Sequence, residues 1–268
     1  MGNKIFILSC VIILLHSCNT TNYLPGFDFK LFNNSSVKEL AIAVEKEDLK
    51  KIKEVLRDKS ISVNYQEPKF GHTLLMLAVA NNKIKSVEAL LKNNANPNLN
   101  SRENEDNSIS IAAENYPDLC DTAILHLLTK YGGDVNFTQH INRVENNGMH
   151  SIVKRTTLMI AVRNDCYLIA KYLIDKGAKI NVYTFYEGYG AITEAIIQNN
   201  LKVAKYLIIH KRAIIPPYIF KRQANISHKG EPEKYLTITG LLNEQQYDKG
   251  IENNKLREEI ISYLENLK

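Results

Sequence analysis

The sequence predicts an all-α solenoid, in which about five helix–turn–helix repeats stack through hairpin-like connections and carry caps at both ends. The first observation is internal repetition, because residues 71–98 and 156–181 align without gaps. The second is the period, because one core alanine follows another at spacings of 35, 34, 49 and 34 residues. These alanines are Ala43, Ala78, Ala112, Ala161 and Ala195.

Residues 1–17 have the pattern of a lipoprotein signal peptide. Lys4 precedes an apolar run from Ile5 to Leu15, which is too short to span a bilayer but has the length of a signal-peptide core. The run ends in Leu15-His16-Ser17-Cys18, which resembles a bacterial lipobox. The resemblance implies export, acylation of Cys18 and anchoring to the inner or outer membrane of the cell envelope. The alternatives are an ordinary secretory signal with an incidental cysteine, and a cytosolic protein with an apolar N-terminus.

Residues 18–35 are expected to form a tether, because proline, glycine and polar residues leave no sustained helical period there. The repeats follow over residues 36–215. Thr73 and Thr156 stand where a hydroxyl can cap the first helix of a repeat. Four residues after each core alanine the turn needs a left-handed backbone, which asparagine and aspartate tolerate best after glycine. Those positions hold Asn82, Asp165 and Asn199.

Period and pattern together resemble the ankyrin repeat, whose core reads Gly-x-Thr-Pro-Leu-His-x-Ala and which closes on Gly-Ala-Asp-x-Asn. The match covers residues 36–215. The usual histidine of that core is replaced by Met76, Ser110, Met159 and Thr193. Because that histidine makes hydrogen bonds within and between repeats of the family, we expect a less rigidly tied array. Met76 and Met159 are expected to pack in the core.

Two regions depart from the period. About residues 137–155 form an insertion, which should lengthen the loop or hairpin between the third and fourth repeats. Residues 216–268 are expected to be a C-terminal capping region, because five apolar residues recur there at helical spacing. They are Leu256, Ile260, Ile261, Leu264 and Leu267. A free amphipathic helix that docks on a partner or a membrane is the alternative.

Composition and motifs argue against several functions. The net charge of +5 comes from 34 basic and 29 acidic residues, which is too mild an excess to indicate nucleic-acid binding. No nucleophile elbow, phosphate-binding glycine loop or His-Glu-x-x-His motif occurs in the sequence. His140 and His150 share the insertion, but no cysteine accompanies them there. We therefore expect no catalytic residue, no metal and no cofactor.

Two cysteines would remain in the mature protein, Cys120 and Cys166. Both are expected near the start of the second helix in adjacent repeats. Stacked helices lie about 8–10 Å apart, whereas a disulfide needs Cα atoms about 4.4–6.8 Å apart. This spacing argues against a bridge, although export into an oxidising compartment would favour one.

The resemblance implies a membrane-anchored, non-catalytic protein–protein interaction module, monomeric and with an unknown protein partner. The alternatives are a structural spacer or self-assembling surface protein, and an enzyme hidden in the insertion or the C-terminal region. Ankyrin arrays bind proteins on the concave face formed by hairpin tips and first helices. Positions six, eight or nine residues before a core alanine lie at the hairpin tip, and positions two or three after it lie at the exposed end of the first helix. Among these positions we select side chains that are common in binding hot spots. The predicted contacts are Lys69, Phe70, His72, Asn81, Arg163, Tyr186 and Tyr189.

Overall fold

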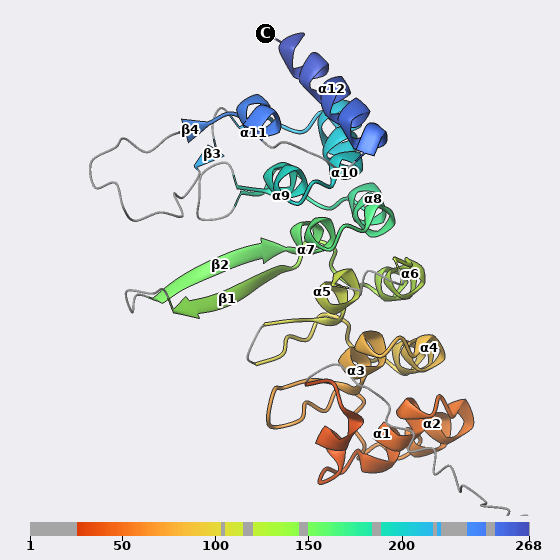
Figure 1. Cartoon of the computed structure of the whole chain (residues 1–268). Helices are drawn as coiled ribbons and strands as arrows, with labels where there is room; N and C mark the ends of the chain where they lie inside the picture. The colour runs from red at the N-terminus through yellow and green to blue at the C-terminus, as the bar shows by residue number, and fades with distance from the viewer. Residues whose placement is uncertain are drawn as a thin grey trace, which may run out of the picture.

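Five pairs of helices stack into an elongated array with a row of inner helices and a row of outer helices (Figure 1). The computed structural model describes residues 26–102, 105–114, 120–144, 150–183, 189–216, 219–220, 235–244 and 250–267. The proposed signal peptide, Cys18 and Tyr186 lie outside the described residues. The inner helices are α1 (Lys38–Glu45), α3 (Leu74–Ala80), α5 (Ser108–Ala113), α7 (Thr157–Arg163) and α9 (Ala191–Ile197). The outer helices are α2 (Leu49–Val55), α4 (Ile84–Lys92), α6 (Ala123–Lys130), α8 (Tyr167–Asp175) and α10 (Leu201–Lys205), which a π-helical turn at Tyr206–His210 continues.

Local sequence signals set the ends of these helices. The hydroxyls of Thr73 and Thr156 accept hydrogen bonds from backbone N–H groups of α3 and α7, at 3.2 Å in both repeats. The turn between inner and outer helix is left-handed at Asn82, Asp165 and Asn199, with φ of 52°, 54° and 58°. Both predictions are confirmed.

The core runs the length of the array between the two rows of helices. Ala78, Ala161 and Ala195 are fully buried, which lets neighbouring helices approach closely. Met76 and Met159 are buried as well, as the sequence predicted. Each inner helix packs on the inner helix of the next repeat, so stability comes from stacking rather than from any single repeat.

Asparagine side chains tie each repeat to the following one. The asparagine that closes a repeat accepts a hydrogen bond from a backbone N–H one repeat further along the chain. The pairs are Asn64 with Asn96 N at 2.8 Å, Asn98 with Asp134 N at 2.9 Å, Asn136 with Lys179 N at 2.8 Å, and Asn181 with Ile214 N at 2.9 Å. The first three also donate to a backbone carbonyl of the next repeat. These contacts link the repeats without the family's histidine.

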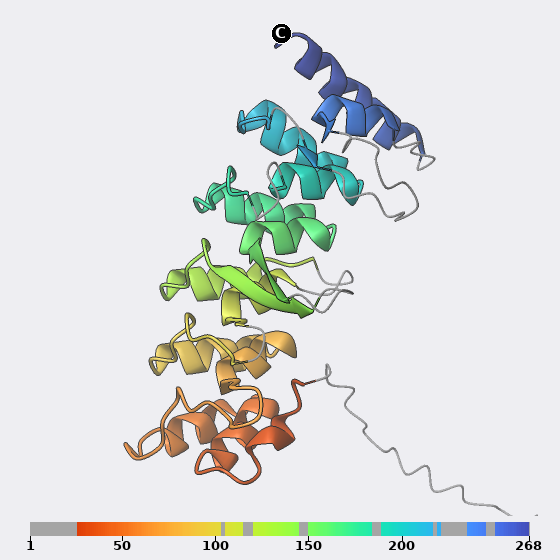
Figure 2. The same cartoon turned by 90° about the vertical axis from the view of Figure 1, so that its left-hand side faces the viewer.

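The insertion between the third and fourth repeats forms a hairpin that projects from the inner row (Figures 1 and 2). Its strands are β1 (Thr138–Val144) and β2 (His150–Thr156), which pair antiparallel with Thr138 opposite Thr156. The extra residues therefore lengthen an existing connection and leave α5 packed against α7.

The second half of the expected tether is folded, which corrects its predicted extent. Residues Phe29–Phe32 form a 3-10 helix that packs on α1, and its first turn is capped by Asp28, whose Oδ1 accepts from Lys30 N at 2.8 Å. Phe29 and Phe32 are buried. Two aromatic side chains three residues apart can be buried by a single short turn without a sustained helical period, so the pattern gives no signal.

The far end of the array carries a cap. Strands β3 (Ile219–Phe220) and β4 (Tyr235–Leu236) precede α11 (Ile238–Glu244) and α12 (Gly250–Glu265), and α12 packs against α10. Ile260 and Leu264 are buried, as the predicted stripe requires. Leu267 was predicted to belong to the same stripe, but it is 60% exposed, which corrects that prediction. Within the part of the chain that the structure describes, no helix combines the length and apolarity needed to cross a membrane.

Candidate partner-binding surface

Equivalent positions of successive repeats line up along one side of the array, which we call the inner face. One column lies six residues before each core alanine, in the connection that leads into an inner helix. Its members are His72, Asp106, Arg155 and Tyr189. The second column lies two residues after the core alanine, at the end of the inner helix. Its members are Ala80, Glu114, Arg163 and Ile197.

The chain's own N-terminal segment occupies the inner face at the second repeat. The carbonyl of Gly26 lies 3.1 Å from Nδ1 of His72, and Asn81 Nδ2 donates to the carbonyl of Phe27 at 2.9 Å. The imidazole of His72 is stacked between Phe27 and Phe70, with ring centroids 4.6 and 5.4 Å away. This end of the inner face is therefore covered from within the molecule.

Four predicted contacts fall in this covered region, and two of them need correction. His72 is only 6% exposed, and Asn81 is half-buried beneath Phe27. Both side chains hold the N-terminal segment rather than facing solvent. Lys69 is exposed, and its ammonium lies 4.7 Å from the centre of the half-buried Phe70 ring.

A buried carboxylate shapes the connection that carries Lys69 and Phe70. Glu67 is fully buried, and its carboxylate accepts hydrogen bonds from the backbone N–H groups of Lys69, Phe70 and His72 at 2.7, 2.8 and 3.0 Å. Both oxygens of the buried side chain therefore have hydrogen-bond donors from the connection itself.

The middle of the inner face carries two carboxylates with raised pKa values. Asp106, 5% exposed, accepts from Ser110 Oγ at 3.2 Å and from Gln139 Nε2 at 2.6 Å. Burial raises the pKa of Asp106 to about 6, although these hydrogen bonds and Arg155 act in the opposite direction. Glu114 ends α5, and its side chain reaches solvent. Desolvation by the surrounding protein is the main cause that raises the pKa of Glu114 to about 7, and the negative charge of Asp106 contributes secondarily.

Two arginines stand near these carboxylates. Arg155 is the strand partner of Gln139 at the base of the hairpin, and Arg163 is an exposed residue at the end of α7. Both lower the pKa of Glu114, but less than its surroundings raise it. Arg163 therefore lies where the repeat frame predicted an accessible side chain.

Tyr189 is half-buried and serves a contact within its own repeat. Its hydroxyl donates to the carboxylate of Glu194, a residue 4% exposed, which also accepts from Gln198 Nε2 at 3.1 Å. Burial first, and Glu194 second, raise the pKa of the Tyr189 hydroxyl. Tyr189 is therefore only partly available to a partner, and Tyr186 lies outside the described residues.

The hairpin base has a second polar face. His140 Nδ1 lies 2.8 Å from a carboxylate oxygen of Glu105, and the strand partner of His140 is Lys154. A hollow of about 340 Å³ opens between this face and Tyr183 of the next connection. Nowhere among the described residues do three or more His, Cys, Asp or Glu side chains come together as metal ligands.

A larger open hollow, of about 730 Å³, lies on the other side of the array among α4, α6 and α8. Tyr172 lines it, with its hydroxyl 2.6 Å from Thr129 Oγ1 and its ring centroid 4.4 Å from that of His126. These contacts join the third repeat to the fourth. They pair the hydroxyls of Thr129 and Tyr172 with each other.

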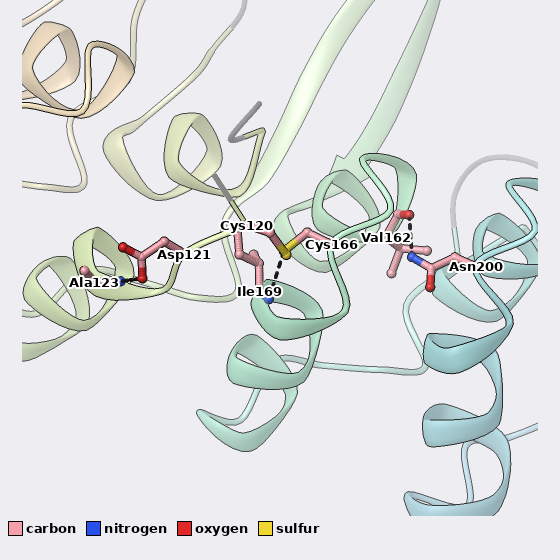
Figure 3. The surroundings of a disulfide bond; sticks show 7 residues. All are labelled: Cys120, Asp121, Ala123, Val162, Cys166, Ile169 and Asn200. Atoms are coloured by element: carbon pink, nitrogen blue, oxygen red, sulfur yellow. Dashed lines mark hydrogen bonds between the residues drawn. A yellow bond between two sulfur atoms is a disulfide. The ribbon is translucent and has the colours of Figure 1, made fainter. Parts of the chain in front are cut away.

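Cys120 and Cys166 form a disulfide, which corrects the expectation that the helix spacing keeps them apart (Figure 3). Their Cα atoms are 5.5 Å apart. Cys166 caps α8, with its sulfur 3.4 Å from Ile169 N, but Cys120 lies in the connection before α6. Because Cys120 is not part of a helix, the distance between stacked helices does not fix its position. A left-handed backbone conformation at Cys120 brings its sulfur to the next repeat.

Sequence reasoning missed Asp106, Glu114 and Arg155. The repeat frame contained the signal, because Asp106 and Arg155 share the position of His72, and Glu114 shares that of Arg163. A hot-spot criterion selects aromatic and arginine side chains, so it does not select the carboxylates in the same columns.

Comparisons with known proteins identify the same architecture. The family described as Ankyrin repeats (3 copies) matches residues 40–139 and 109–216. Among solved structures, the chain is similar to the ankyrin repeat domain of Bcl-3, described as a unique member of the IkappaB protein family. The TM-score is 0.53, with 21% identity over 66% of this chain and 72% of that one, a likeness of fold alone. No curated protein sequence matches the chain.

Proposed function

The chain belongs to the ankyrin-repeat family, and we propose that it is a non-catalytic module that holds a partner protein at the bacterial cell envelope, anchored by acylation of Cys18. Ankyrin repeats indicate a protein–protein interaction module, so the proposal adds the surface, the anchor and the location to that assignment.

One observation carries the choice of surface. At the second repeat the inner face is covered by the chain's own N-terminal segment, whereas from the third repeat onward Glu114 and Arg163 reach solvent in the same column. Stacking of the repeats does not require a charged side chain at either position, because Ala80 and Ile197 stand at the equivalent places. Exposed charges that the fold does not need are available for recognition.

Two features of the chain support export. The first is the apolar run that ends in Leu15-His16-Ser17-Cys18. The second is the disulfide between Cys120 and Cys166, since such bonds persist mainly in oxidising compartments outside the cytosol. The two features lie in different parts of the chain and rest on different chemistry.

Affinity capture from detergent-solubilised membranes tests the interaction. The full chain should retain a defined protein, and Arg163→Ala should lose it. Lys53→Ala is the matched control, because Lys53 is an exposed cation on the outer helix α2. Equal capture by both variants would move the partner away from the inner face. Self-association of the purified chain with no captured protein would favour the structural alternative.

Detergent phase partitioning in cells tests the anchor. Cys18→Ala should move the chain from the detergent phase to the aqueous phase, because acyl chains contribute about 0.8 kcal/mol per buried methylene. Cys120→Ala, which removes a cysteine elsewhere and breaks the disulfide, should leave partitioning unchanged. A Cys18→Ala chain that stays in the detergent phase would refute lipidation at this residue.

A further inference from the structure

Hydrogen-bond acceptors gather where the hairpin base meets the third repeat. We call Asp106, Glu114 and Gln139 the acidic corner. Asp106 precedes α5, Glu114 ends it, and Gln139 reaches across from β1 to donate to Asp106. The corner is thus built by two segments that lie on opposite sides of the third repeat's outer helix in the sequence.

One acceptor of the corner is unused. Gln139 is 3% exposed, and its Nε2 is committed to Asp106 Oδ1 at 2.6 Å. Its Oε1, on the same amide group, has no hydrogen-bond partner within the part of the chain that the structure describes. A buried acceptor without a donor costs free energy, so the corner gains from a donor supplied from outside.

The two arginines near the corner do not fully offset the desolvation of its carboxylates. Arg155 and Arg163 act on Glu114, and Arg155 acts on Asp106, yet both carboxylates keep raised pKa values. Two other carboxylates among the described residues already have partners. They are Glu105 with His140, and Glu194 with the Tyr189 hydroxyl.

We propose that the acidic corner receives the cationic end of a lysine or arginine side chain from the partner protein. This inference rests on the proposed function and names the chemistry that the partner presents. A long, narrow side chain can bring its N–H donors past exposed Glu114 toward the buried acceptors of Asp106 and Gln139. An anion would meet two carboxylates and an unpaired carbonyl oxygen there.

Binding of a cation should depend on pH in a defined direction. The cation favours the ionised carboxylates and therefore lowers both pKa values, so binding releases protons. Affinity should be highest near pH 8 and should fall as the pH passes through about 7 and then about 6. Between about pH 8 and 5.5, protonation of Glu114 alone can weaken binding by up to about thirtyfold.

A labelled hexalysine peptide and the full chain in detergent test the proposal by fluorescence anisotropy. Hexaglutamine and hexaglutamate serve as neutral and acidic probes. Because the chain carries a net charge of +5, hexalysine is not attracted to it in general. Hexalysine should bind best, and its affinity should fall at least about tenfold from pH 8 to 5.5 at constant ionic strength.

Variants locate the binding. Glu114→Gln should weaken hexalysine binding by about tenfold or more at pH 8 and flatten the pH dependence. Asp106→Asn should have the same direction of effect. Glu54→Gln is the matched control, since Glu54 is an exposed carboxylate on α2 paired with Lys51. The affinity of this variant for hexalysine should stay within about twofold of that of the unchanged chain. Glu114 reaches solvent, so its variant tests the proposal independently of Asp106→Asn.

Three results would overturn the proposal: preferred binding of hexaglutamate, affinity independent of pH, or equal weakening by Glu54→Gln. The partner protein separates this failure from failure of the proposed function. Capture that is lost in Arg163→Ala but retained in Glu114→Gln and Asp106→Asn would keep the inner-face module and reject the cation. Capture retained in all three variants would reject the inner face itself.

Discussion

Replacing Asp106 by asparagine tests how much the buried carboxylate weakens the fold. Burial moves the pKa of Asp106 from its ordinary 3.8 to about 6 in the folded chain. The unfolded chain therefore releases this proton first, so the stability contributed by the protonated group is complete below about pH 4 and is lost as the pH rises through 6. At about 1.4 kcal/mol for each pH unit between the two pKa values, the loss at pH 8 is about 3 kcal/mol.

Asparagine keeps the oxygen that accepts from Ser110 and Gln139 but carries no charge. Its new N–H group also needs an acceptor, which reduces the gain. We expect Asp106→Asn to raise the free energy of unfolding by about 1–3 kcal/mol at pH 8, and to change it little at pH 4. Urea unfolding followed by far-ultraviolet circular dichroism at both pH values measures the difference. Glu54→Gln is again the control. A gain that is equal at the two pH values, or absent at both, would refute an under-compensated charge at Asp106.

Three further predictions concern stability. Reducing the disulfide, whose cysteines are 46 residues apart, should lower the free energy of unfolding by about 2–4 kcal/mol, and urea unfolding with and without reductant measures this; an unchanged midpoint would mean the bond does not form in solution. Replacing residues 141–153 by Asn-Gly, a preferred two-residue hairpin turn, should leave helical content and cooperative melting nearly intact, whereas loss of the fold would show that the hairpin belongs to the stack. Glu67→Ala should cost about 2–3 kcal/mol and increase hydrogen exchange at the N–H groups of Lys69 and Phe70, while normal exchange there would contradict the three hydrogen bonds.

Features that depend on one repeat could be predicted from the sequence. The caps at Thr73 and Thr156 and the left-handed turns at Asn82 and Asp165 follow from side-chain chemistry within a few residues. The insertion was visible as a break in the period for the same reason. Each of these features recurs at a fixed place in the frame, so one copy supports the next.

Features that depend on where a distant segment lies could not be predicted this way. His72 is buried only because Phe27, 45 residues earlier, returns to cover it. Cys120 reaches Cys166 only because the connection before α6 turns toward the next repeat. The asparagine ties show an intermediate case. Asn98 was recognised as the residue that closes a repeat, but its acceptor role toward Asp134 required the neighbouring repeat to be in place.

Docking of the N-terminal segment also sets how far the array can stand from its anchor. Seven residues separate Cys18 from Gly26, which is the first residue that the structure describes and is held on the inner face. Even fully extended, that stretch spans at most about 29 Å. With a lipid on Cys18, this short segment would keep the second repeat close to the bilayer surface. The later repeats, where Glu114 and Arg163 reach solvent, would be the part of the array that can reach a protein farther from the membrane.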